Sequence, residues 1–162
     1  MPPSPTVAHV AVPLLGVSTG LRSFTPLAVL SWFARSGKLP VKGTWASWIA
    51  HPAAVGLLTA AAVGEYVGDK LPNTPNRTSP VALIGRIALG ATVGAVVASA
   101  YRGKVVRGVA LGALGAVAGT YGGYYVRKGL TKGAGLADLP VAITGDSAAI
   151  ALAIRSLNRL TA

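Results

Sequence analysis

The residues best suited to chemistry in this 162-residue chain are its few acidic side chains, because only four Asp and Glu stand against 15 Lys and Arg. Glu65 and Asp69 are four residues apart, a spacing that places both carboxylates on one face of a helix. Asp146 interrupts a later apolar stretch, and Asp138 lies at the start of that stretch, where an acid complements the helix dipole. We therefore take Glu65, Asp69 and Asp146 as candidate site residues.

Two arginines fall at depths that match these acids. With a helix rise of about 1.5 Å per residue, Glu65 lies roughly 9 Å inside the end of its apolar segment. Arg86 lies at about the same depth on the antiparallel neighbour, and Asp146 lies roughly 12 Å deep in the last segment. Arg22 falls at a break in the first segment, near the middle of a membrane. Arg22 and Arg86 therefore join the candidate site. Asp69 is nearer the surface, where Arg77 is a potential partner.

Charges buried in hydrocarbon cost a few kcal/mol at least, so these side chains must pair with one another or line water. One interpretation is a set of ion pairs that fixes helix register. The other is a polar cavity that handles an ion, a proton or an anionic headgroup. Intramembrane ionisable groups favour the second interpretation.

The composition that surrounds these charges is typical of a membrane protein. Hydrophobic residues make up 52% of the chain and charged residues 12%, and the mean hydropathy is +0.57. A soluble domain carries about 25% charged residues. Apolar stretches near 20 residues long suit membrane-spanning helices. The sequence thus predicts an all-α, polytopic helical membrane protein, with residues 1–162 as one transmembrane domain.

About five spans are expected, the first of them broken. An arginine, a glycine and a proline fall within residues 20–26, which makes a continuous helix unfavourable there. We expect two half-helices joined by an irregular turn, which lipid tolerates only if the turn is buried in protein or lines a wet cavity. The remaining expected spans are Ala53–Leu71, Val81–Tyr101, Gly108–Val126 and Asp138–Leu157.

Glycines recur at helical spacing in two of these spans. Such small residues let helix backbones approach closely in lipid. They predict a tight helix–helix interface, inside the chain in the favoured interpretation and between subunits of a homo-oligomer in the other. The helix-packing candidates are Gly90, Gly94, Gly108, Gly112, Gly115, Gly119 and Gly123.

Net charge and rare residue types exclude several classes. The net charge of +11 comes mainly from basic residues between the apolar runs, which indicates contact with anionic lipid headgroups rather than with nucleic acid. The chain has no cysteine, and only His9 and His51 as histidines, so neither a metal site nor a cofactor is expected. The distribution of basic residues predicts a multi-pass protein of the inner (plasma) membrane with a cytoplasmic C-terminus.

Weak self-similarity indicates a possible inverted repeat. A glycine-spaced first segment precedes Gly64-Glu65, and a glycine-spaced fourth span precedes Gly145-Asp146. Inverted repeats with a discontinuous helix and charges at the midplane are a transporter design.

Two motifs resemble a known family. They are the sequences GLRSFTP at 20–26 and GEYVGDKLPNTP at 64–75, the latter followed by Arg77 and Thr78. They resemble domain-of-unknown-function family 4126, a group of small, mainly bacterial integral membrane proteins. The resemblance covers most of the chain, including Gly145-Asp146. It implies a helical membrane protein and no assigned activity, and it adds no catalytic residues.

These residues are compatible with three functions. The favoured hypothesis is a transporter or channel-like protein that moves an ion, a proton-coupled solute or an anionic small molecule past the buried charges. The alternative is a non-catalytic membrane scaffold or assembly partner that uses the glycine-rich interfaces. A lipid-modifying enzyme is the weakest hypothesis, because the sequence offers neither a nucleophile–base pair nor a metal cluster.

Overall fold

The structure is a computed structural model that describes residues 5–68, 79–133 and 135–161, and these residues form helices and no strands. The predicted all-α class is therefore confirmed. The elements are α1 (Pro5–Leu21), α2 (Thr25–Arg35), the short 3-10 helix η1 (Trp45–Ala50), α3 (Pro52–Gly68), α4 (Pro80–Ala100), α5 (Val105–Lys128), the π-helical turn η2 (Gly129–Gly133) and α6 (Asp138–Thr161).

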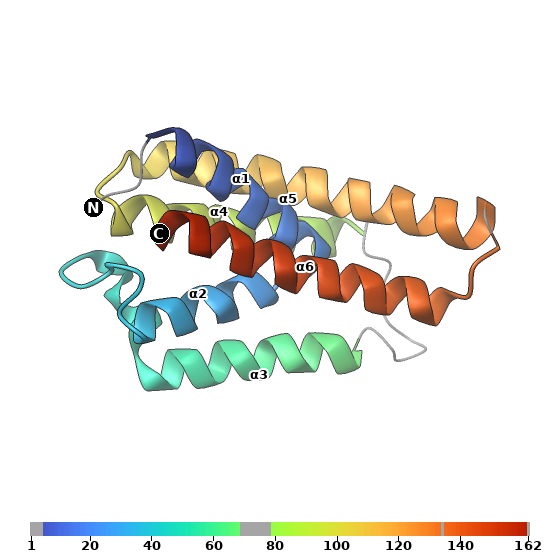
Figure 1. The fold of residues 1–162 in the computed structure, drawn as a ribbon, viewed down its shortest axis with the longest axis horizontal. Helices are drawn as coiled ribbons and strands as arrows, with labels where there is room; N and C mark the ends of the chain where they lie inside the picture. Colours follow the sequence, from blue (N-terminus) through green and yellow to red (C-terminus); the bar gives the residue numbers. More distant parts are fainter. Residues whose placement is uncertain (1–4, 69–78, 134, 162) are drawn as a thin grey trace.

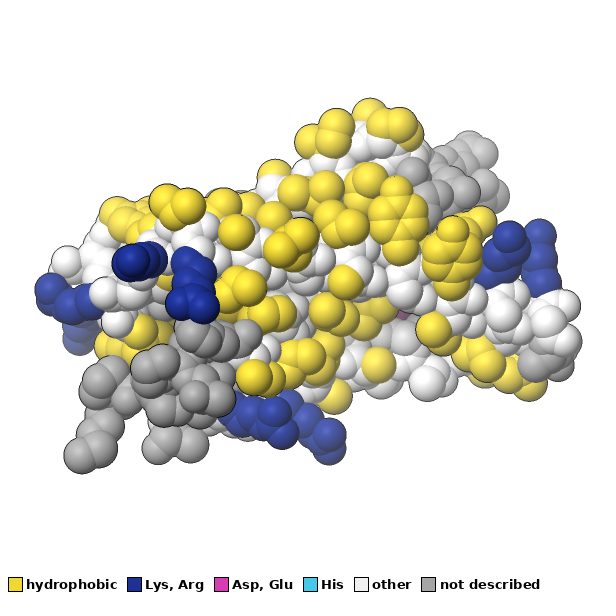
Figure 2. Space-filling view, turned by 90° about the horizontal axis from the view of Figure 1, so that it is seen from above, with side chains coloured by type: hydrophobic (Ala, Val, Ile, Leu, Met, Phe, Trp, Pro, Cys, Tyr) yellow, Lys and Arg dark blue, Asp and Glu magenta, His cyan; other side chains and the backbone are white. Residues whose placement is uncertain are grey.

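Three of the described helical stretches are long and apolar enough to cross a membrane: Pro80–Ala100, Val105–Gly133 and Pro140–Thr161. Shorter apolar stretches cover Val10–Leu21 and Pro52–Gly68. In Figure 2, hydrophobic side chains cover much of the middle of the surface, and most of the Lys and Arg side chains lie toward the two ends. This distribution is that of a membrane protein. The expected count of about five spans is not confirmed.

The first segment folds back on itself. α1 ends at Leu21 and α2 begins at Thr25, with Pro26 in its first turn. α1 runs from the end of the molecule where α6 finishes toward the interior, and α2 returns to that same end (Figure 1). The broken segment is thus a helical hairpin with its tip among the other helices. The inverted repeat is not confirmed either, because the counterpart of this hairpin, α5, is one unbroken helix.

Glycines bring α1, α4 and α5 into close contact. A Cβ atom on Gly90 would lie 2.7 Å from the Cβ atom of Ala116, and one on Gly94 would overlap the carbonyl group of Gly108. All seven of the predicted packing glycines face another helix of the same chain in this way: Gly90, Gly94, Gly108 and Gly112 join α4 to α5, and Gly115, Gly119 and Gly123 join α5 to α1.

Hydrogen bonds join the helices at the end of the bundle where α4 and α6 finish. The Trp45 indole N–H donates to Ser99 Oγ at 2.6 Å, which ties η1 to α4. The Tyr101 hydroxyl, just after α4, donates to the carbonyl oxygen of Leu160 at 2.6 Å, which ties α4 to α6. These bonds fix the helix ends that lie nearest the base of the α1–α2 hairpin.

Replacing Tyr101 with Phe should lower the free energy of unfolding by about 1 kcal/mol. The substitution removes the hydroxyl donor, so the carbonyl oxygen of Leu160 loses this hydrogen bond. Burial also raises the pKa of the Tyr101 phenol above its ordinary value of 10.0. The stabilisation is therefore complete below pH 10 and is lost as pH rises through the higher pKa of the folded state. Thermal unfolding of both proteins from pH 7 to 11 tests this, and identical curves at every pH would contradict it.

Candidate functional site at the tip of the first hairpin

The tip of the α1–α2 hairpin leaves main-chain groups at two helix ends that need partners inside the protein. Just before α2, the carboxylate of Glu65 accepts hydrogen bonds from two main-chain N–H groups. The Ser23 N–H donates to Oε1 at 2.8 Å, and the Phe24 N–H donates to Oε2 at 3.0 Å. An anion is favoured at this position, because the N-terminus of a helix carries the positive end of the helix dipole. α3 thus supplies a carboxylate that holds the turn just before α2.

Arg86 serves the other side of the break. Its Nη1 donates to the carbonyl oxygen of Gly20 in the last turn of α1. The Thr120 hydroxyl of α5 also reaches this oxygen, at 3.3 Å. Arg86 Nη2 lies 3.8 Å from Glu65 Oε1, so the same guanidinium forms an ion pair with the carboxylate that holds the turn just before α2.

The second ion pair joins the hairpin tip to α6. Arg22 Nε donates to Asp146 Oδ1 at 2.7 Å, and Nη2 contacts the same oxygen. The guanidinium also lies over the Tyr66 ring, 4.6 Å from its centroid, which adds a cation–π attraction. The Tyr66 hydroxyl accepts a hydrogen bond from Thr25 Oγ1 at 3.4 Å, so the residue after Glu65 also contacts the start of α2.

These four charged side chains are largely shielded from solvent. Arg22 is 2% exposed and Arg86 6%, while Glu65 and Asp146 are 11% and 13% exposed. Two positive and two negative charges thus meet around one turn of backbone, and their formal charges cancel. The layer is built from the hairpin, α3, α4 and α6, which are distant in sequence.

The structure brings four of the five predicted site residues together: Arg22, Glu65, Arg86 and Asp146. The fifth, Asp69, and its proposed partner Arg77 lie outside the described residues. The depths calculated from helix rise correctly predicted Arg86 as a neighbour of Glu65. It did not reveal that Glu65 also binds main-chain amides, because a sequence does not show which backbone groups lack partners.

Two further side chains contribute that the sequence reading missed. Thr120 reaches the Gly20 carbonyl, and Ser18 donates to the carbonyl oxygen of Ala149 at 2.7 Å, which joins α1 to α6. Both are small polar residues in apolar helices. The sequence gives no further signal for either residue, since Ser18 bonds to α6 while Gly16, two residues earlier, packs against α5.

The chemistry open to this site is recognition of an anion. Two amides and a guanidinium converge on one point, and a carboxylate of the protein occupies it. Across the described ranges, no group of three or more His, Asp or Glu side chains stands close enough to hold a metal ion.

Comparison with known proteins places most of the chain in one family. The family model described as "Domain of unknown function (DUF4126)" matches residues 10–158, which include every residue of the hairpin site. No curated protein and no solved structure matches the chain.

Proposed function

The chain belongs to the DUF4126 family, a domain of unknown function, and we propose that it is a small membrane transporter or channel-like protein that passes a small anion at the tip of the α1–α2 hairpin. The observation that carries this proposal is the position of Glu65. Its carboxylate binds the two main-chain amides just before α2 and lies beside Arg86, where a free anion would bind. In this proposal Glu65 is a tethered anion that competes with the transported one.

Half-helices that meet near the midplane support such a role. In transporters, the N-terminal ends of discontinuous helices point at anionic groups of the substrate. α2 has this character, since it begins inside the helical bundle and the two main-chain amides just before it bind a carboxylate. Displacement of Glu65 would expose those amides to an ion without moving the helices that frame them.

The proposed topology has four membrane-spanning helices and a re-entrant hairpin instead of five spans. α3, α4, α5 and α6 would cross the membrane, and the α1–α2 hairpin would enter it from one side and return. The possible inverted repeat stays a prediction. We place the protein in the inner (plasma) membrane with its C-terminus in the cytoplasm, bound to a bilayer with anionic headgroups, and we propose neither an enzymatic activity nor nucleic-acid binding.

The alternative remains a non-catalytic membrane scaffold or assembly partner. Direct pairing of all four buried charges favours it, because ion pairs that fix helix register need no substrate. The predicted glycine interfaces are occupied inside the chain, so a partner or a second copy would need another face. The outer side of α3 is one option, since Leu57 and Val63 are exposed and a Cβ atom on Gly64 would meet open space.

Anion flux into liposomes separates the two functions. Replacing Glu65 with Gln should raise flux by about tenfold, which corresponds to ~1.4 kcal/mol of lost competition for the site. The readout is quenching of an encapsulated halide-sensitive dye, with the membrane potential clamped. Gly64→Ala is the matched control, because it changes the adjacent residue where a Cβ has open space.

Two outcomes would count against transport. Flux through wild-type protein and Glu65→Gln equal to that of protein-free vesicles would support the scaffold. Equal gains in Glu65→Gln and Gly64→Ala would show a nonspecific leak. Thermal unfolding of each reconstituted variant would establish that the proteins are folded in both cases.

A further inference from the structure

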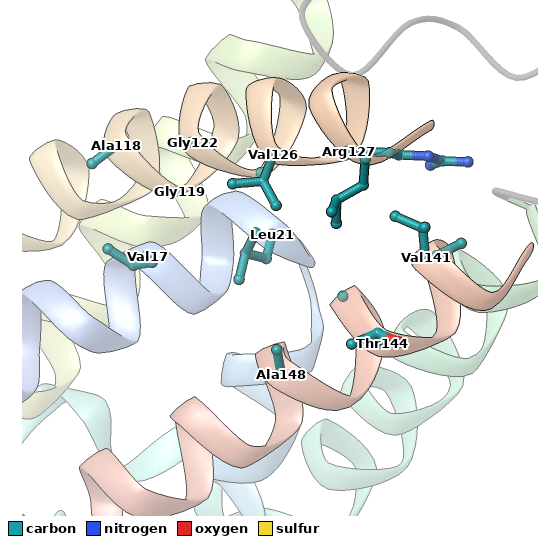
Figure 3. Close-up of a pocket in the computed structure, with 14 residues that line it drawn as sticks. Val17, Leu21, Ala118, Gly119, Gly122, Val126, Arg127, Val141, Thr144 and Ala148 are labelled. Carbon is teal, nitrogen blue, oxygen red and sulfur yellow. The ribbon is translucent and has the colours of Figure 1, made fainter. Parts of the chain in front are cut away.

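A groove lies between the C-terminal half of α5 and the N-terminal half of α6, and the four charged side chains at the hairpin tip are not among its lining residues. Its volume is about 390 Å³, and α1 closes its floor (Figure 3). Figure 3 shows Val126 of α5 on one side of the groove, Leu21 of α1 between the two sides, and on the other side three residues of α6, Val141, Thr144 and Ala148. Glycines of α5 and α6 widen it, because they contribute no side chain to the walls.

The open end of the groove is basic. Arg127 lines it and extends toward the carboxyl end of α5, beyond the apolar walls (Figure 3). Lys128 and Lys132 follow within the next turns and are exposed. An apolar groove with Arg127 at its open end, and two exposed lysines close by in the sequence, matches a molecule with a hydrocarbon body and an anionic head.

The charge at the open end of the groove favours a lipid over a helix as its occupant. An acyl chain that ends in an anionic headgroup would place its negative charge at Arg127, whereas an apolar helix of a partner brings no such charge.

We propose that this groove binds one acyl chain of an anionic phospholipid, whose phosphate contacts Arg127 and Lys132. The inference does not depend on anion transport, since the groove is lined by residues other than the four charges at the hairpin tip. The lipid would bridge α5 and α6 at the end of these helices nearest η2.

The test fills the groove without disturbing the fold. Gly122 lines it, and a Cβ atom there would meet nothing within 4 Å, so Gly122→Leu adds a side chain to open space. Gly56→Leu is the matched control on α3, where a Cβ atom also has open space. Native mass spectrometry and thermal unfolding in detergent would measure binding of phosphatidylglycerol, with phosphatidylcholine of the same chains and inorganic phosphate alone as comparisons.

Phosphatidylglycerol should bind and stabilise the wild type and Gly56→Leu, and Gly122→Leu should bind it at least tenfold more weakly. Arg127→Gln and Lys132→Gln should each weaken binding about fivefold, the factor expected for one basic side chain near anionic lipid. Equal affinity of Gly122→Leu and Gly56→Leu would overturn the groove as the site. Equal binding of phosphatidylcholine would overturn the anionic head, and equal stabilisation by inorganic phosphate would overturn the acyl chain. A dimer lost only in Gly122→Leu would assign the groove to a second copy instead.

Discussion

Replacing Asp146 with Leu is expected to lower the free energy of unfolding by about 3–5 kcal/mol, the cost of breaking a buried ion pair by removing one partner. The Arg22 guanidinium is 2% exposed and donates from Nε to the Asp146 carboxylate at 2.7 Å. Removal of that carboxylate takes an ion-pair partner from a buried guanidinium at the hairpin tip. Unfolding in detergent, followed by circular dichroism, gives the free energies.

A double variant makes this prediction specific to the pair. Arg22→Met combined with Asp146→Leu should recover most of the loss, because neither charge then remains buried. Arg155→Met, at an exposed position of α6, is the control and should change stability by less than about 0.5 kcal/mol. A double variant no more stable than Asp146→Leu alone would contradict the assigned pairing.

Replacing Gly94 with Ala is expected to be the second large effect, with a loss of about 1–3 kcal/mol. A methyl group on Gly94 would overlap the carbonyl group of Gly108, so α4 and α5 would have to separate. Gly85→Ala lies on the same helix, where a Cβ atom has open space. It should be neutral or stabilise by up to about 1 kcal/mol, through helix propensity alone.

The pair of alanine variants isolates the interface from intrinsic helix preference. Both add one methyl group to a glycine of α4, and only one adds it against another helix. Melting temperatures measured in the same detergent are sufficient. Equal shifts in the two variants would show that the α4–α5 approach is not as close as described.

Much of the charged layer could be predicted because depth in a helix follows directly from residue number. Counting from the expected helix ends placed Glu65 beside Arg86, and they form an ion pair at 3.8 Å. The fold of the first segment could not be predicted in the same way. A break at Arg22 permits a kinked span or a hairpin, and the choice depends on long-range bonds such as that from Arg86 to the Gly20 carbonyl.

The spacing of the glycines was also not enough to predict which of them lie in helix contacts. Gly122 and Gly123 are neighbours in sequence, yet a Cβ atom on Gly123 would press on Leu21 and one on Gly122 would meet open space. The small-residue pattern therefore predicted that α5 packs closely, and it could not separate the glycines in contact from those that border the groove. That distinction depends on the path of α6, which lines the other side of the groove.

In the proposed topology the first segment enters the membrane as a hairpin and returns, and cysteine labelling tests this most directly. The chain has no cysteine, so single cysteines can be added before Met1, at Gly37 and at Gly133. A membrane-impermeant maleimide applied to intact cells and to inverted vesicles reports the side of each. The hairpin predicts that the added N-terminal cysteine and Gly37→Cys react from the same side and Gly133→Cys from the other. Reaction of the N-terminal cysteine on the side of Gly133→Cys, opposite Gly37→Cys, would mean that the first segment crosses and would contradict this account.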